Sequence, residues 1–250
     1  MLLLALDTAT TVCSVALVGD TGVSAEVTTT DGPGDGAVAL IARLLTEQGV
    51  SRSQLTHVGV GVGPGPYTST RIGVMIAVTM GAALGIPVVG ICSLDAIARG
   101  VRSAARGAAG EPVLGVATDA RRKEVYWALF DAYGSRVAGP AVTKPVQLLA
   151  DVHCRSWAGN GFDRYPLLAE QNGVQRLQPS TPSAAVLGGM VIEGLARGEE
   201  PRAMLPNVGA HSGDGAGSIA KGDRLLAPYP LYLRRPDAVE PAAGVGVAHA

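Results

Sequence analysis

The sequence is poor in charged and aromatic residues. Only 16% of its 250 residues are Asp, Glu, Lys or Arg and 4% are Phe, Trp or Tyr, whereas 47% are hydrophobic. The formal net charge is −1, so the chain lacks the positive field that holds a polyphosphate backbone. We therefore do not expect it to bind nucleic acid by itself. Its length allows two modest domains with cores of close-packed Ala, Val, Leu and Gly.

Metal-ligand, disulfide and catalytic patterns are also missing. The three cysteines are odd in number and far apart, which suits a reduced cytoplasm better than a disulfide framework: Cys13, Cys92 and Cys154. The four histidines form no HxxH, HxxxH or Cys/His pair: His57, His153, His211 and His249. No Ser/His/Asp set or pair of catalytic carboxylates can be assembled either. We expect a cytoplasmic protein without a metal site.

One long uncharged run, from Ile72 to Leu94, has the length of a membrane span. Gly81, Gly85 and Pro87 interrupt it, and "GIP" ends a helix before the short strand "VVGI". The N-terminal "MLLLALD" has no basic leader and reaches Asp7 early, so it indicates a first strand. We expect no membrane association.

The order of predicted elements repeats once along the chain. Strands are expected at 2–7, 12–18 and 22–29, then a helix at 35–49, a Ser51/Gln54 capping box, a strand at 55–63, a helix at 70–84, a strand at 86–91 and a helix at 93–106. From residue 112 the plan restarts, with strands before Asp119, before Asp131 and at 135–143, a helix at 144–152, a strand at 156–161 and a helix at about 181–197. This is the pattern of an internal duplication.

Three hairpin-connected strands, a helix, a strand, a helix and a strand, occurring twice, predict an α/β protein of two ribonuclease-H-like halves. This is the actin-like (ASKHA) architecture, in which each half is a mixed sheet with flanking helices. We expect the first subdomain at 1–106 and a smaller second one at 107–235. The Gly/Ser-rich segment 209–223 is expected to be a mobile surface loop, and 236–250 a disordered tail.

Two turns are candidate phosphate contacts. Asp7 and Thr8 follow the first strand, where actin-like folds hold magnesium-bound phosphate; an Asx-type hydrogen bond within the turn is the alternative that we prefer. Gly63 and Gly65 in "GPGPYTSTR" let the backbone approach another group just before a helix. The loop lacks the lysine of a P-loop and the spacing of a dinucleotide site, and Arg71 can pair with a carboxylate instead.

The segment "DARRKEVYWALF" places three cations in a hairpin turn before an alternating strand. We interpret the charges as a solvated turn, and the side chains of Val125, Trp127 and Leu129 as one core-facing side of the strand.

Several blocks together resemble one family. "LALDTATTVCSVAL", "GVGPGPYTSTRIGV", "ALGIPVVGICSLDAIA", "DARRKEVYWALF" and "PLYLRRPDA" occur in this order and are similar to the bacterial TsaB (YeaZ) family of tRNA threonylcarbamoyladenosine biosynthesis. The resemblance runs from residue 2 to about 237. This chain departs from the family loop "GxFTGLRIG" at Tyr67 and Ser69.

The resemblance implies a non-catalytic paralogue of the glycoprotease-like TsaD subunit, with the duplicated actin-like fold. Such a chain pairs with a TsaD-type catalytic subunit, works with a TsaE-type ATPase, and meets tRNA only through the complex. It needs no cofactor itself, and ATP belongs to the complex. The HxxxH metal motif of the catalytic relatives is absent from "DGPGDGAVALIARLL".

The uncharged helix after the glycine loop is therefore our candidate partner interface, together with the apolar stripe of the first helix. The residues that we expect there are Val38, Ile41, Leu45, Arg71, Ile72, Met75, Ile76, Thr79 and Met80. The same face would form a homodimer when the partner is missing. Burial of this face within the first domain is the alternative. A glycoprotease-like metallopeptidase and a self-sufficient actin-fold ATPase or kinase remain the alternative functions.

Overall fold

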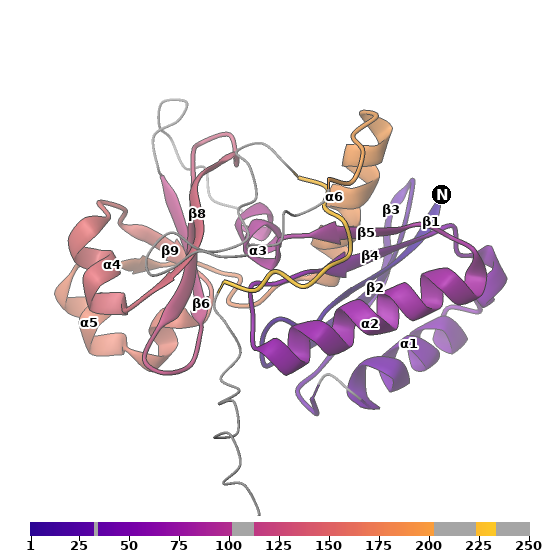
Figure 1. Ribbon diagram of the computed structural model, residues 1–250, viewed down its shortest axis with the longest axis horizontal. Coiled ribbons are helices and arrows are strands. Elements are labelled where there is room, and N and C mark those ends of the chain that lie inside the picture. The colour runs from indigo at the N-terminus through magenta and orange to yellow at the C-terminus, as the bar shows by residue number, and fades with distance from the viewer. Residues whose placement is uncertain (33–34, 102–112, 203–223, 234–250) are drawn as a thin grey trace, which may run out of the picture.

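The protein folds into two α/β halves that lie side by side (Figure 1). The structure is a computed structural model that describes residues 1–32, 35–101, 113–202 and 224–233. The expected loop at 209–223 and the expected tail at 236–250 lie outside the described residues, as does the expected boundary at 106/107.

The first half is built on a five-stranded mixed sheet with the order β3-β2-β1-β4-β5. Its central pairs are antiparallel β1/β2, with Leu6 opposite Val15, and parallel β1/β4, with Leu6 opposite Val60. The strands match the predicted ones within a few residues at their ends: β1 (Leu2–Asp7), β2 (Cys13–Gly19), β3 (Gly22–Thr29), β4 (His57–Gly61) and β5 (Val88–Ile91).

Helices cover the first sheet because alternate residues of β1 enter different cores. Leu4 and Leu6 pack with α1 (Asp35–Glu47) and α2 (Tyr67–Leu84), whereas Leu3 and Ala5 pack on the opposite face. Gly85 ends α2 in the left-handed conformation, as "GIP" predicts. The capping box at Ser51 and Gln54 is confirmed, around the short helix η1 (Arg52–Gln54).

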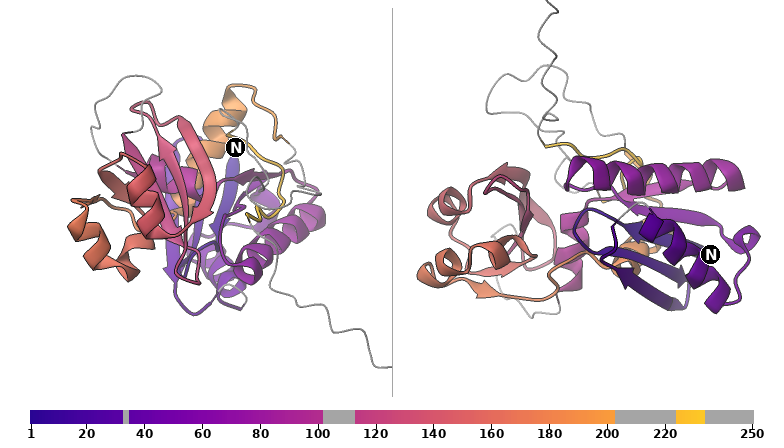
Figure 2. Two further views of the ribbon diagram at one scale, coloured as in Figure 1. Left: turned by 60° about the vertical axis from the view of Figure 1, so that its left-hand side comes forward. Right: turned by 90° about the horizontal axis from the view of Figure 1, so that it is seen from below.

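The second half repeats the first. Its sheet has the order β10-β9-β6-β7-β8, so β6 corresponds to β1, β7 to β2, β8 to β3, β9 to β4 and β10 to β5. Its elements are β6 (Leu114–Asp119), β7 (Val125–Phe130), β8 (Arg136–Thr143), α4 (Pro145–Asp151), β9 (Ser156–Ala158), η2 (Gly161–Arg164), α5 (Pro166–Gln171) and β10 (Gln175–Arg176). The predicted duplication and fold class are confirmed, although η2, α5 and β10 were not expected. Figure 2 shows this half as a separate lobe beside the first sheet.

The position of the last helix differs from the expected domain division. Helix α6 (Ala184–Ala196) is close to the predicted 181–197, but it packs on the first sheet, against Leu3, Ala5 and Val18. The Ser14 hydroxyl accepts a hydrogen bond of 3.0 Å from the Ala184 amide. The segment 224–233 also returns to the first half, where Gly90 and Leu226 exchange backbone hydrogen bonds of 2.7 and 2.9 Å. The expected subdomain 107–235 therefore includes elements that belong to the first half.

Helix α3 (Ser93–Gly100) connects the halves. It ends at Gly100, before the expected 106, and its Leu94 and Ile97 share a core with Val116, Tyr126 and Phe130 of the second sheet. Helix α3 also packs against α6.

Among the described residues, no helix is both long enough and apolar enough to cross a membrane. All three cysteines are buried and free, which agrees with the expected absence of a disulfide framework.

Candidate functional site

The turn after β1 is held by its own aspartate. One carboxylate oxygen of Asp7, Oδ1, accepts a hydrogen bond of 2.8 Å from the Ala9 amide, which is the Asx-type bond that we preferred from the sequence. The other oxygen, Oδ2, accepts one of 2.6 Å from the Ser93 hydroxyl at the start of α3. The Gly63 amide in turn donates to this hydroxyl over 3.2 Å. Asp7 thus joins β1, the glycine loop and α3.

Burial changes the acidity of this carboxyl. The side chain is fully buried, which raises the pKa of Asp7 from 3.8 to about 6, because the hydrogen bonds from Ser93 and Ala9 offset only part of the desolvation. The group serves a structural junction, although such a shift is also found at functional carboxylates.

The glycine loop lies directly against the turn. A Cβ atom at Gly61 would fall 1.8 Å from Asp7 Oδ2, and one at Gly65 would fall 2.4 Å from the Ala9 carbonyl oxygen. The Thr8 hydroxyl donates to the Ser69 carbonyl over 2.7 Å. Glycine is therefore required for close approach of chain to chain.

The four residues expected to contact a cofactor are thus brought together, but they contact one another. Asp7, Thr8, Gly63 and Gly65 are all buried. Their described hydrogen bonds go to neighbouring protein groups, and a cofactor contact at these residues stays a prediction.

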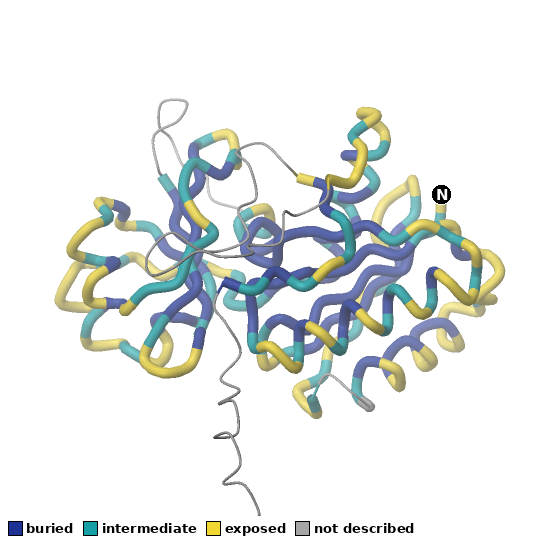
Figure 3. Tube along the Cα trace, in the orientation of Figure 1, coloured by how far each residue is buried: buried dark blue, intermediate teal, exposed yellow. Residues whose placement is uncertain are grey.

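The candidate partner interface lies on the outer face of α2. Its inner face buries Val74, Ala77 and Gly81. Arg71, Met75 and Thr79 are exposed, and the apolar residues between them are half-buried: Ile72, Ile76 and Met80. Figure 3 shows this alternation of exposed and buried positions along the helix.

The first helix supplies less of this face than expected. Val38 is 56% exposed, but Ile41 and Leu45 belong to the core of the first half. The apolar stripe of α1 thus faces inward, and of its three expected residues only Val38 is accessible to a partner.

The basic turn between β6 and β7 is exposed, as predicted. Arg121, Arg122 and Lys123 have φ angles of 61°, 53° and 61°, an uncommon left-handed run for residues other than glycine. Of the strand that follows, Val125 and Leu129 are buried and Trp127 packs against the same core. The prediction of a core-facing side is confirmed.

Sequence reasoning missed a buried ion pair between the halves. Asp95 on α3 lies 3.2 Å from Arg136 at the start of β8, and both side chains are nearly buried. Asp95 lies in the block "ALGIPVVGICSLDAIA", but that block does not indicate a partner, and only the packing of α3 on the second sheet brings the two residues together.

Comparisons with known proteins agree with this architecture. The family model described as tRNA N6-adenosine threonylcarbamoyltransferase (TsaD) matches residues 36–179. The Escherichia coli tRNA threonylcarbamoyladenosine biosynthesis protein TsaB is 32% identical over 185 residues, which cover 70% of this chain and 78% of that protein. An uncharacterized protein of Mycobacterium tuberculosis is 32% identical, with 94% of this chain and 92% of that protein covered.

Two further relatives complete the comparison. An uncharacterized Mycobacterium leprae protein is 42% identical over 158 residues, but the match spans only 40% of its length and 59% of this chain. The solved structure of YeaZ from Pseudomonas aeruginosa superposes with a TM-score of 0.63 at 28% identity, covering 79% of this chain and 93% of that one. The chain belongs to the TsaB (YeaZ) family.

Proposed function

We propose that this chain is a non-catalytic accessory subunit in tRNA threonylcarbamoyladenosine biosynthesis. Membership of the TsaB family supports a role in this process. The chain would bind a TsaD-type catalytic paralogue and enable threonylcarbamoyl transfer to N6 of the adenosine next to the anticodon. A TsaE-type ATPase would act in the same complex, where ATP is bound, and tRNA would be met only through it.

The observation that carries the proposal is the outer face of α2. Met75 is 52% exposed between the half-buried Ile72, Ile76 and Met80. Arg71 is the only charged residue among the 18 of this helix. We interpret this mostly uncharged face, with an exposed methionine among partly buried apolar residues, as a contact surface for another protein.

The duplicated fold indicates how a paralogue would dock there. A catalytic subunit with the same architecture would present an equivalent helix, so the two helices could pack ridge into groove across a pseudo-twofold axis. A second copy of this chain could use the same face. We therefore expect a homodimer of the isolated chain, which the paralogue displaces.

The closed turn at Asp7 fits an accessory role. Asp7 and Thr8, expected to contact phosphate in an actin-like enzyme, are buried beneath the glycine loop and the start of α2. A subunit whose first turn is filled by its own chain would leave the chemistry to its partner.

Reconstitution tests the proposal. Threonylcarbamoyladenosine is measured in a tRNA transcript with the catalytic paralogue, the TsaE-type ATPase and this chain, and again with this chain omitted. We expect product only in the full mixture, and no peptidase or ATPase turnover by the chain alone. Product formation without the chain would contradict the proposal, as would turnover by the pure chain that is lost in Asp7→Ala.

A further inference from the structure

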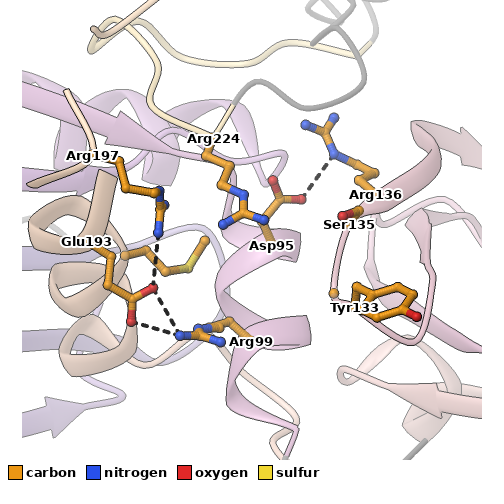
Figure 4. Close-up of a pocket in the computed structure, with 10 residues that line it drawn as sticks. Asp95, Arg99, Tyr133, Ser135, Arg136, Glu193, Arg197 and Arg224 are labelled. Carbon is orange, nitrogen blue, oxygen red and sulfur yellow. Dashed lines mark hydrogen bonds and ion pairs between the residues drawn. The ribbon is translucent and has the colours of Figure 1, made fainter. Parts of the chain in front are cut away.

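A second site lies on the other side of the molecule from α2. A cavity of about 160 Å³ opens between α3, α6, the turn joining β7 to β8, and Arg224 (Figure 4). The turn at residues 131–135 is at the opposite end of β7 from the basic turn at 121–123. Helix α6 covers the face of the first sheet opposite to α1 and α2. The cavity is thus separate from both the Asp7 turn and the proposed partner face.

The cavity is strongly cationic in a chain that is almost neutral. Four arginines and two carboxylates line it, a formal excess of two positive charges, against −1 for the whole chain: Arg99, Arg136, Arg197, Arg224, Asp95 and Glu193. Such a concentration of one sign in a concave site attracts anions.

Its inner wall contains a nearly buried ion pair. The Arg136 guanidinium lies 3.2 Å from Asp95, with 5% and 11% of the two side chains exposed. Arg224 approaches the same carboxylate from the side of the first half (Figure 4). This wall contains residues of both halves, since Arg136 begins β8 and Asp95 lies on α3.

The outer wall is exchangeable. Glu193 on α6 accepts two hydrogen bonds from Arg99, of 2.7 and 3.0 Å, and lies 3.9 Å from Arg197. Arg197 also donates a hydrogen bond of 2.8 Å to Glu199. The two arginine side chains are about half exposed, so we expect their guanidinium groups to be able to turn from Glu193 and Glu199 to a bound anion. In such a site Glu193 competes with the anion for Arg99 and Arg197, and Glu199 competes with it for Arg197.

We propose that this cavity binds a small phosphate-bearing anion that bridges the two halves. Guanidinium groups form paired, charge-assisted hydrogen bonds with phosphate oxygens. The volume is below the roughly 300–1,000 Å³ of pockets for drug-sized ligands, which favours a ligand of the size of inorganic phosphate or pyrophosphate. Because Arg136 belongs to one half and Arg197 to the other, the anion would fix their relative position.

Substitutions that remove either a positive or a negative charge from the outer wall test the site. Pyrophosphate and inorganic phosphate are titrated calorimetrically into the full chain at constant ionic strength, with sulfate for comparison. We expect Arg99→Gln and Arg197→Gln each to weaken pyrophosphate binding by roughly tenfold, the loss of one charge-assisted contact. Glu193→Gln removes the competitor and should tighten binding several-fold. A merely structural role of these residues would not give effects of opposite sign.

Arg176→Gln is the matched control, because Arg176 is an ion-paired arginine on β10 that does not line the cavity. It should bind pyrophosphate like the wild type. Absence of binding to the wild-type chain would overturn the proposal. Equal affinity in the Arg99→Gln, Arg197→Gln and Arg176→Gln variants would do so too, and equal affinity for sulfate and both phosphates would overturn the assignment to phosphate. Circular dichroism of each variant confirms the fold.

Discussion

The two halves have the same strand order, and the aspartate at the end of the first strand of each accepts an Asx-type hydrogen bond, but the surroundings of the two carboxylates differ. In the first half, Asp7 is fully buried and its carboxylate accepts hydrogen bonds from Ala9 and Ser93. In the second half, Asp119 ends the corresponding strand beside an exposed basic turn, and its carboxylate lies 3.7 Å from Arg121 and 3.8 Å from Arg164. Among the described residues, Asp7 is completely buried, whereas 12% of the Asp119 side chain is exposed.

The difference follows from what comes after the fourth strand of each half. In the first half, a glycine loop leads into α2, which has 18 residues, and both the loop and the start of α2 pack against the Asp7 turn. In the second half, the corresponding place holds η2 and α5, with only four and six residues. The long helix thus closes the turn on its inner side and offers an apolar face on its outer side. One element thus both covers the Asp7 turn and carries the face that we propose for the partner.

The largest effect on stability is expected from a side chain added at Gly61, which packs against the turn at Asp7. In Gly61→Ala the new Cβ would overlap Asp7 Oδ2 and disturb its bond to Ser93. We expect a loss of about 3 kcal/mol or more in the free energy of unfolding, since overpacking and a broken buried hydrogen bond add. Urea denaturation measures it.

Gly189→Ala is the control for this substitution, because a Cβ on Gly189 in α6 meets nothing within 4 Å. It should be neutral or stabilising by up to about 1 kcal/mol, from helix propensity. A Gly61→Ala protein as stable as the wild type would mean that the turn is not packed as described.

A smaller effect concerns the pH dependence of stability. Burial raises the pKa of Asp7 from 3.8 to about 6, so the folded state holds this proton more tightly than the unfolded state. Its contribution is therefore most favourable below pH 4 and is lost as the pH rises to above 6. At 1.36 kcal/mol per pKa unit, the loss is on the order of 3 kcal/mol at most.

The Asp7→Asn variant should lack this loss of stability between pH 4 and 6, whereas Asp119→Asn should retain it. Denaturation at several pH values from 4 to 7 compares the two. Buried Asp95 also has a raised pKa, chiefly from desolvation, and contributes a slope of the same sign in every variant. The prediction fails if Asp7→Asn and the wild type lose stability in parallel.

The smallest effect on stability is expected in the exposed basic turn at residues 121–123. Lys123 has a φ of 61°, which costs less for glycine than for lysine. The gain is partly cancelled by the greater freedom of glycine in the unfolded chain. Lys123→Gly should therefore change stability by less than about 1 kcal/mol, in the stabilising direction. Thermal unfolding measures it, and a marked loss would show that this exposed lysine side chain makes a stabilising contact.

Local patterns predicted most of the elements and the duplication, because alternation and helical spacing are properties of short segments. The Asx bond of Asp7 was predictable for the same reason, since it spans two residues. The burial of Asp7 was not, because it depends on Ser93, which lies 86 residues later.

Long-range packing also explains the errors. The apolar helix α6 could have covered either sheet, and its N-terminus is tied to the first by Glu26, which accepts hydrogen bonds from the hydroxyls of both Ser14 and Ser183. The stripe with Ile41 and Leu45 was recognised, but an apolar stripe does not say whether it faces the chain's own core or a partner. The Asp95–Arg136 pair has no local sequence signal at all.

The central claim is that the outer face of α2 binds the catalytic paralogue, and one pair of variants tests it most directly. Met75→Glu places a charge on this face, whereas Leu167→Glu places one on α5 of the second half, where Leu167 is 70% exposed. An unpaired charge in a desolvated contact costs several kcal/mol, roughly a hundredfold or more in Kd.

Light scattering measures self-association of the two folded variants, and co-purification measures capture of the TsaD-type paralogue. We expect Met75→Glu to be monomeric and to capture little paralogue, and Leu167→Glu to behave like the wild type in both assays. Normal self-association and normal capture by Met75→Glu would contradict it.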